Sequence, residues 1–196
     1  MLFQVYIIII LFCLGTSILN KVSRQNLLYI YFSLVVIIEI GFYLRSLPTV
    51  IYNASPLLYI SFFTYYFGNQ KNSNKKIIYA IGSIAFTFCL YLYVIEGFEK
   101  YSIQAGTAMN LVYIFFALQW LFNQLKYVDE NSLLKKQAFW FSTSLLIWSV
   151  IFLFRLIPMY WLDIHDNHFL RQINLGYQIT TILSYCLFLK GLFCKI

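Results

Sequence analysis

Two aspartates and two histidines lie within six residues and form the densest group of metal-ligating side chains in the sequence. They are Asp163, His165, Asp166 and His168. Imidazole and carboxylate groups are ordinary ligands of Zn²⁺ and similar divalent ions. The spacing matches no established metal signature, and a short polar turn has the same composition. We therefore consider two interpretations, a divalent metal site and a plain turn.

Glu39 and Arg155 are charged residues inside apolar stretches. At about 1.5 Å per helical residue, Glu39 lies ~18 Å above the start of its stretch, past the middle of a ~30 Å hydrocarbon core. An unpaired carboxylate there costs about 3 kcal/mol or more. Arg155 is the nearest partner by depth, and its side chain leans toward Glu39. An ion pair that locks two helices is the first interpretation, and a ligand or ion site is the alternative.

Catalytic and cofactor motifs are missing. The sequence contains no HExxH, GxSxG, GxxxxGK[ST] or GxGxxG pattern. No aspartate and no histidine lies within an apolar stretch, which argues against an aspartyl intramembrane protease and against haem held between helices. Glu39 and Glu96 remain as a carboxylate pair, but nothing identifies a nucleophile or an oxyanion partner. We expect no enzyme activity and no cofactor.

The composition indicates which elements must position these residues. The chain has 196 residues, of which 61% are hydrophobic and 11% charged, whereas about a quarter of a soluble domain is charged. A soluble fold of this length cannot bury so much apolar surface. The net charge of +7 lies in short clusters between apolar stretches. This pattern is typical of loops beside anionic lipid, so we expect an integral membrane protein that binds no nucleic acid.

Seven continuous apolar stretches are each long enough for a membrane-spanning helix of about 20 residues. They cover residues 2–19, 27–44, 49–68, 77–98, 105–125, 138–162 and 173–193, and the third and seventh are the most polar. The runs do not alternate as barrel strands do. The sequence therefore predicts an all-α bundle of seven transmembrane helices in one domain, residues 1–196.

The basic residues predict the orientation of this bundle. Ten lie in loops on one side, namely Lys21, Arg24, Lys71, Lys75, Lys76, Lys126, Lys135, Lys136, Lys190 and Lys195. Three lie on the other side, namely Arg45, Lys100 and Arg171. Because cytoplasmic loops are rich in lysine and arginine, the N-terminus is expected outside and the C-terminus in the cytoplasm. Loops this short are typical of a bacterial cytoplasmic (inner) membrane protein.

The second and sixth stretches share a Phe-x-x-Arg-x-x-Pro frame, at residues 42–48 and 152–158. One interpretation is a duplicated unit of three helices joined by the fourth, a three-plus-one-plus-three arrangement found in small sugar transporters. The other is that arginine followed by proline commonly ends an apolar helix. We favour the second, since the other pairs of stretches align poorly.

The polar side chains within the stretches are unevenly distributed in depth. Eight lie in the outer halves, namely Gln4, Glu39, Asn53, Glu96, Asn110, Arg155, Asn174 and Gln178. Three lie in the inner halves, namely Gln119, Asn123 and Gln124. Polar groups in a bilayer usually face the bundle interior. We therefore predict an outward-facing polar cavity above an apolar floor. All the outer residues except Gln4 are expected to bind a ligand, which makes seven.

These features predict a receptor-like sensor or accessory module. An unknown small ligand would enter the outer cavity, and the basic loops would meet a cytoplasmic or membrane protein partner. The alternative is a small-solute transporter, which needs polar or helix-breaking residues through the midplane. The apolar inner half favours the sensor, and an intramembrane enzyme is the least favoured class.

Overall fold

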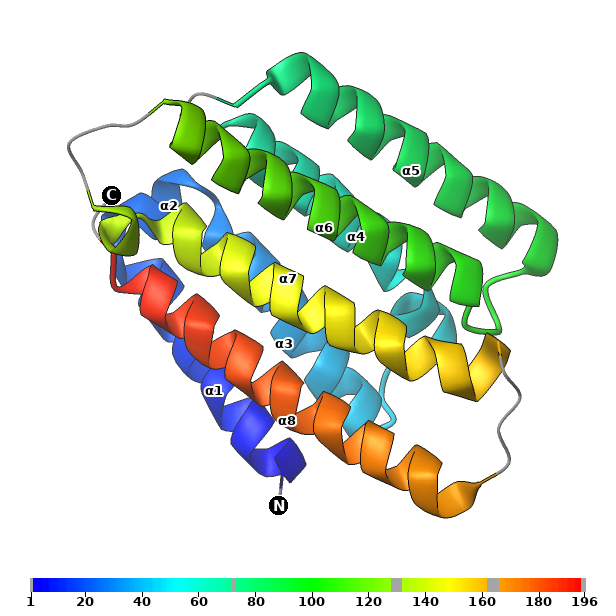
Figure 1. The fold of residues 1–196 in the computed structure, drawn as a ribbon. Coiled ribbons are helices and arrows are strands. Elements are labelled where there is room, and N and C mark those ends of the chain that lie inside the picture. Colours follow the sequence, from blue (N-terminus) through cyan, green and yellow to red (C-terminus); the bar gives the residue numbers. More distant parts are fainter. Residues whose placement is uncertain (1, 72, 128–131, 162–165, 195–196) are drawn as a thin grey trace.

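The computed structural model describes residues 2–71, 73–127, 132–161 and 166–194, without the side chain of Trp161. Within these ranges every regular element is a helix and no strand occurs. Figure 1 shows the long helices lying side by side. In chain order the elements are α1 (Leu2–Leu19), α2 (Lys21–Gln25), α3 (Leu28–Tyr43), α4 (Thr49–Gly68), α5 (Lys75–Glu96), α6 (Ile103–Lys126), η1 (Leu133–Lys135), α7 (Gln137–Leu156), the π-helix η2 (Ile157–Trp161) and α8 (Asn167–Leu192).

Each of the seven apolar stretches contains one long helix, and the bounds of α1 and α4 are those predicted. The largest difference is at α8, which begins at Asn167 instead of Ile173. The Asp166 carboxylate causes this earlier start. Its Oδ1 accepts hydrogen bonds from the backbone amides of His168 at 2.9 Å and Phe169 at 3.2 Å, which caps the helix.

Four of the described helices are long and apolar enough to cross a membrane. They are α1, α5, α6 and the segment Gln137–Tyr160, which comprises α7 and the start of η2. α3 is apolar but has only 16 residues. α4 and α8 are long enough but more polar, as the sequence indicated for the third and seventh stretches.

Six helices form a closed ring that follows the chain order. α1 packs against α3 and α8, α4 packs against α3 and α6, and α7 packs against α6 and α8. α5 lies outside this ring, where it contacts α4 and α6. In Figure 1, α5 runs along one edge of the molecule and α7 lies between α6 and α8. Because α5 returns the chain to its starting end, α6, α7 and α8 repeat the directions of α1, α3 and α4.

Aromatic side chains fill the middle of the ring. Phe63 and Phe67 of α4 and Phe141 of α7 are fully buried. The Phe141 ring stacks on Tyr66 with 5.3 Å between centroids and meets Phe188 of α8 at 4.6 Å. Rings of this size bury much apolar area and favour such offset and edge contacts. We call these five residues the aromatic floor.

α7 and α8 approach each other closely at small residues. The Ser144 hydroxyl donates to the Ser184 carbonyl at 2.7 Å, and the Ser184 hydroxyl donates to the Ser144 carbonyl at 3.4 Å. Nearer the end of α8, a Cβ atom on Gly191 would meet Trp140 and Phe141. Small residues of this kind let two helix backbones approach in a membrane. We call Ser144 and Ser184 the serine pair.

Amide side chains join the helix termini at the end of the molecule where α1 and α8 finish. Gln137 Nε2 donates to Ser23 Oγ at 2.9 Å, and Asn26 Nδ2 donates to Gln137 Oε1 at 2.9 Å. Asn20 Nδ2 donates to the Leu192 carbonyl at 2.6 Å. This amide latch, formed by Asn20, Ser23, Asn26 and Gln137, connects the segment between α1 and α3 with α7 and α8.

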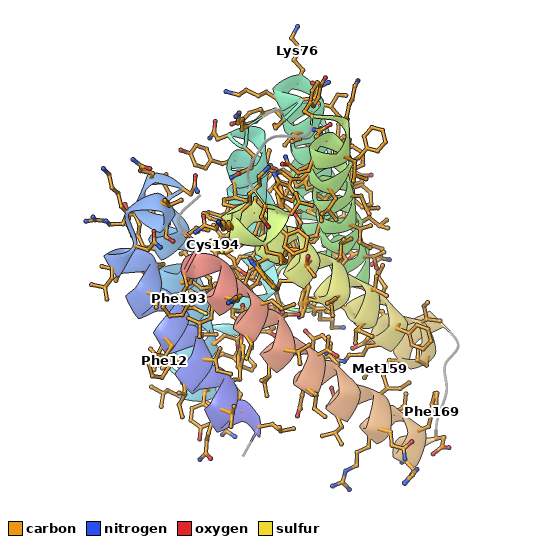
Figure 2. All side chains as sticks on the ribbon, turned by 60° about the vertical axis from the view of Figure 1, so that its left-hand side comes forward. Phe12, Lys76, Met159, Phe169, Phe193 and Cys194 are labelled. Atoms are coloured by element: carbon orange, nitrogen blue, oxygen red, sulfur yellow. The ribbon has the colours of Figure 1, made fainter. Side chains whose placement is uncertain are left out.

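Lysine and arginine side chains gather at the same end, which we call the basic end. The described residues there are Lys21, Arg24, Lys71, Lys75, Lys76, Lys126, Lys135, Lys136 and Lys190, while Lys195 lies outside the described residues. Figure 2 shows Lys76 and Cys194 at the upper ends of α5 and α8, with Met159 and Phe169 at the lower right. The basic residues of the described opposite end are Arg45, Lys100 and Arg171.

Candidate functional site

A cavity of about 450 Å³ extends into the ring from the end opposite the basic end and reaches as far as Tyr31 and Phe188. Its walls come from all six ring helices and from the loop before α6, and no described residue of α5 contributes. The exposed side chains of Phe3, Phe42 and Gln178 are part of the lining. The cavity therefore reaches the molecular surface at this end, which we call the cavity end.

Tyrosine is the most frequent residue in the cavity wall. Eight tyrosines line it, namely Tyr6, Tyr31, Tyr52, Tyr59, Tyr101, Tyr113, Tyr177 and Tyr185. Tyr6, Tyr31 and Tyr185 lie close to one another, and the Tyr6 and Tyr185 rings meet edge-on with 5.2 Å between centroids. The Tyr113 hydroxyl is buried and has no hydrogen-bond partner in the described part of the chain. The wall thus combines aromatic faces with hydroxyls that can donate or accept.

Tyr101 is the one cavity tyrosine that lies in a loop outside the predicted spans. Its ring occupies the space that a Cβ atom on Gly106 would need. Burial raises the pKa of the Tyr101 hydroxyl, the neighbouring Tyr177 raises it further, and the positive charge of Arg155 opposes this. The hydroxyl therefore stays neutral and can act as a hydrogen-bond donor.

Glu39 of α3 and Arg155 of α7 both line the cavity. The Arg155 guanidinium carbon lies 4.5 Å from the ring centre of Tyr177. Its Nε is buried without a hydrogen-bond partner among the described residues. The Tyr6 hydroxyl lies close to the Glu39 carboxylate. Within the described structure the two charges thus form no ion pair, which leaves the alternative interpretation, a ligand or ion site.

Asn174 and Gln178 also line the cavity, one helical turn apart on α8. Asn174 is half-buried, while Gln178 is exposed. The two amides extend the polar part of the wall toward the surface. Four of the seven residues expected to bind a ligand are therefore brought together, namely Glu39, Arg155, Asn174 and Gln178.

The other three expected residues do not belong to the described cavity lining. Asn53 Nδ2 donates to the Phe98 carbonyl at 2.9 Å, so this amide anchors the loop after α5. Asn110 Nδ2 donates to the Gly106 carbonyl of its own helix at 2.7 Å. Glu96 is exposed at the end of α5, outside the ring. The depth of these three residues in their spans was predicted from the sequence. Their side chains, however, do not point into the cavity.

Two of the four residues of the expected metal site, Asp163 and His165, lie outside the described residues. The Asp166 carboxylate caps α8, and His168 is exposed in the first turn of that helix. Across the described ranges, no group of three or more histidine, cysteine, aspartate or glutamate side chains is placed to hold a metal ion. With two of its four residues outside the described ranges, the metal site stays a prediction.

The cavity tyrosines are the main component of the wall and were not predicted from the sequence. Tyrosine counts as apolar when a span is identified, so its hydroxyl carries no weight in a search for polar residues. The available signal was the number of tyrosines, 17 in the chain. Eight of these line one cavity, and the prediction of an outer polar site would have been sharper had they been counted.

Comparisons with protein-family models, with characterised proteins and with solved structures find no match to this chain. The function is therefore argued from the geometry of the cavity and of the basic end.

Proposed function

We propose that the chain is a seven-span protein of a bacterial cytoplasmic membrane that senses a small ligand. The ligand enters the cavity from outside, and the basic end meets a cytoplasmic or membrane protein partner. The single observation that carries this proposal is the cavity itself. Six helices surround it at one end of the ring, while the aromatic floor and the amide latch close the other end.

The cavity supports membrane insertion of α3, α4 and α8 beside the four candidate spans, because these three helices contribute to its wall. α4 and α8 are more polar than the four candidate spans, but several of their polar side chains face the cavity instead of the outside. Examples are Tyr52 and Ser55 on α4 and Thr181 on α8. Polar groups in a membrane are tolerated when they line such an interior. The 16 residues of α3 span about 24 Å, which is short but compatible with a locally thinned bilayer.

The charge distribution supports the orientation. Nine described lysines and arginines lie at the basic end, against three at the cavity end. Positive charge is retained on the cytoplasmic side during insertion. The basic end is therefore cytoplasmic in this proposal, and the cavity end faces outward.

A transporter is the second candidate, and one observation favours it. The ring order places α1, α3 and α4 opposite α6, α7 and α8, with α5 outside as a connector. This is the arrangement expected of a three-plus-one-plus-three repeat. A transporter must also open toward the cytoplasm. The amide latch and the aromatic floor oppose such opening, and we therefore place the sensor first.

Cysteine labelling tests both the orientation and the access to the cavity. In a background with the native cysteines replaced, Ser55→Cys should react with a membrane-impermeant thiol reagent added from outside. Ser55 lines the cavity and is half-buried. The matched control is Ser61→Cys, on the outward face of the same helix. It should stay unreactive, because a thiol in lipid does not ionise.

Two loop positions complete this experiment. Lys76→Cys should react only from the cytoplasmic side, and Lys100→Cys only from outside. The reverse pattern would contradict the orientation. Reaction of Ser55→Cys from both sides would replace the sensor by the transporter, since only an alternating cavity is reached from both. No reaction from either side would contradict an open cavity.

A further inference from the structure

The two opposite charges in the cavity are the feature that most restricts its ligand. Glu39 lies on α3 and Arg155 on α7, in opposite layers of the ring. Tyr52 and Tyr177 also line the cavity, and each lies within electrostatic reach of both charges. With no ion pair between the two charges in the described structure, each of them can bind a separate group of one ligand.

Arg155 is arranged to bind an acid group. Its guanidinium carbon lies over the Tyr177 ring, 4.5 Å from the ring centre, and its buried Nε has no hydrogen-bond partner among the described residues. A guanidinium presents several N–H donors in a planar fork, which matches the two oxygens of a carboxylate. An unused buried donor costs free energy, and an acceptor on the ligand removes that cost.

Glu39 is arranged to bind a positively charged group. Tyr6, Tyr52 and Tyr59 all line the cavity and lie within electrostatic reach of the carboxylate. A carboxylate beside several aromatic rings is a suitable site for an ammonium group, because the ring faces attract cations and the carboxylate neutralises the charge.

We propose that the cavity binds a zwitterion of the α-amino acid class, with its carboxylate at Arg155 and its ammonium group at Glu39. This inference rests on the outward-open cavity of the proposed function. A neutral sugar could stack on the tyrosines, but it would leave both charges without a counter-charge in a low-dielectric site. A volume of about 450 Å³ lies in the range of small-ligand pockets. The aromatic wall favours an aromatic or apolar side chain.

The test measures binding of the twenty L-amino acids to the purified full chain in detergent, by calorimetry. A second readout is the fluorescence of Trp148, which lines the cavity. At least one amino acid should bind. The tightest binder is then compared with its decarboxylated amine and its deaminated acid. For L-phenylalanine these are phenethylamine and 3-phenylpropanoate, and each should bind more weakly than the amino acid.

Two variants test which charged group of the ligand each cavity residue binds. Glu39→Gln should weaken binding of the amino acid and of the amine by about tenfold or more, and leave the acid within about twofold. Arg155→Gln should weaken the amino acid and the acid, and leave the amine unchanged. This crossed pattern cannot arise from misfolding, which would affect all three ligands. The matched controls are Glu96→Gln and Arg45→Gln, which remove the same charges away from the cavity and should bind like the parent chain.

Several results would overturn the zwitterion. They are binding of D-glucose or phosphoethanolamine without any amino acid, binding of no amino acid at all, or equal losses for all three ligands in both variants. If Ser55→Cys is still labelled from outside in those cases, the open cavity stands and only the ligand class is wrong. If that labelling also fails, the proposed function fails with it.

Discussion

The two Phe-x-x-Arg-x-x-Pro frames have the same residues at three fixed positions but different structures. In the first frame the helix stops. Arg45 adopts a left-handed conformation with φ of 53°, and the Ser46 amide donates to the Gly41 carbonyl at 2.9 Å. In the second frame α7 continues through Arg155 into the π-helix η2. As a result Arg45 is exposed in a turn, whereas Arg155 lines the cavity.

A residue outside the frame accounts for this difference. The turn after α3 folds back so that the Leu47 side chain fills the space where a Cβ atom of Gly41 would lie. The equivalent position in the second frame holds Ile151. A β-branched side chain there leaves no room for the chain to fold back. A motif can therefore predict an arginine near a helix end without predicting where its side chain points.

Gly41→Ile introduces before the first frame the residue type that precedes the second frame, Ile151. Of the three changes, it should have the largest effect on stability. We expect it to destabilise the protein by about 3 kcal/mol, because Leu47 must leave its site and the turn must reform. Thermal unfolding in detergent measures this change. The control is Gly15→Ile, since a Cβ atom there meets nothing within 4 Å. Similar losses at both positions would contradict the role given to Gly41.

Arg155→Lys should have the next largest effect, on ligand affinity. A lysine ammonium cannot stack over Tyr177 and offer two parallel donors at the same time. We expect amino-acid binding to weaken about tenfold, equivalent to ~1.4 kcal/mol. Arg45→Lys keeps the same charge in the exposed turn and should change affinity less than about twofold. Calorimetric titration of both variants decides whether the two arginines differ in function.

Arg45→Gly should have the smallest effect and the opposite sign. A left-handed conformation disfavours any residue with a Cβ atom by about 1–2 kcal/mol, and glycine avoids this penalty. Part of the gain is lost because glycine is more flexible in the unfolded chain. We expect a net stabilisation of about 0.5–1 kcal/mol in the same unfolding measurement. Arg155→Gly lies within a helix and should instead destabilise, by about 1 kcal/mol.

The helices were largely predictable because each apolar stretch is continuous. The ranges of α1 and α4 agree with the sequence prediction at both ends. The start of α8 was missed because Asp166 was considered as a metal ligand or as part of a turn, whereas an aspartate before a helix is also an ordinary cap. The ring order and the place of α5 depend on which helix faces meet, and a single sequence does not contain that information.

The depth of the site residues in their helices could be predicted from the sequence, but the direction in which their side chains point could not. Glu39 and Arg155 were found because charged side chains in a bilayer rarely face lipid. Asn53 and Asn110 lie at similar depths, but each donates to a backbone carbonyl instead of facing the cavity. A polar residue in a span is satisfied either by the protein or by a ligand. Distinguishing these two outcomes requires the positions of its neighbours.

The serine pair divides α8 into a long segment toward the cavity end and a short segment toward the basic end. From Ser184 the helix extends about 26 Å toward Asn167 at the cavity end and about 12 Å toward Leu192 at the basic end. If α8 tilted as a rigid body about Ser184, a movement of about 2 Å at Asn167 would give a movement of about 1 Å in the opposite direction at Leu192. The Leu192 carbonyl at that end of the helix accepts a hydrogen bond from Asn20 Nδ2. A displacement of α8 at the cavity end would therefore reach the basic end at about half its size.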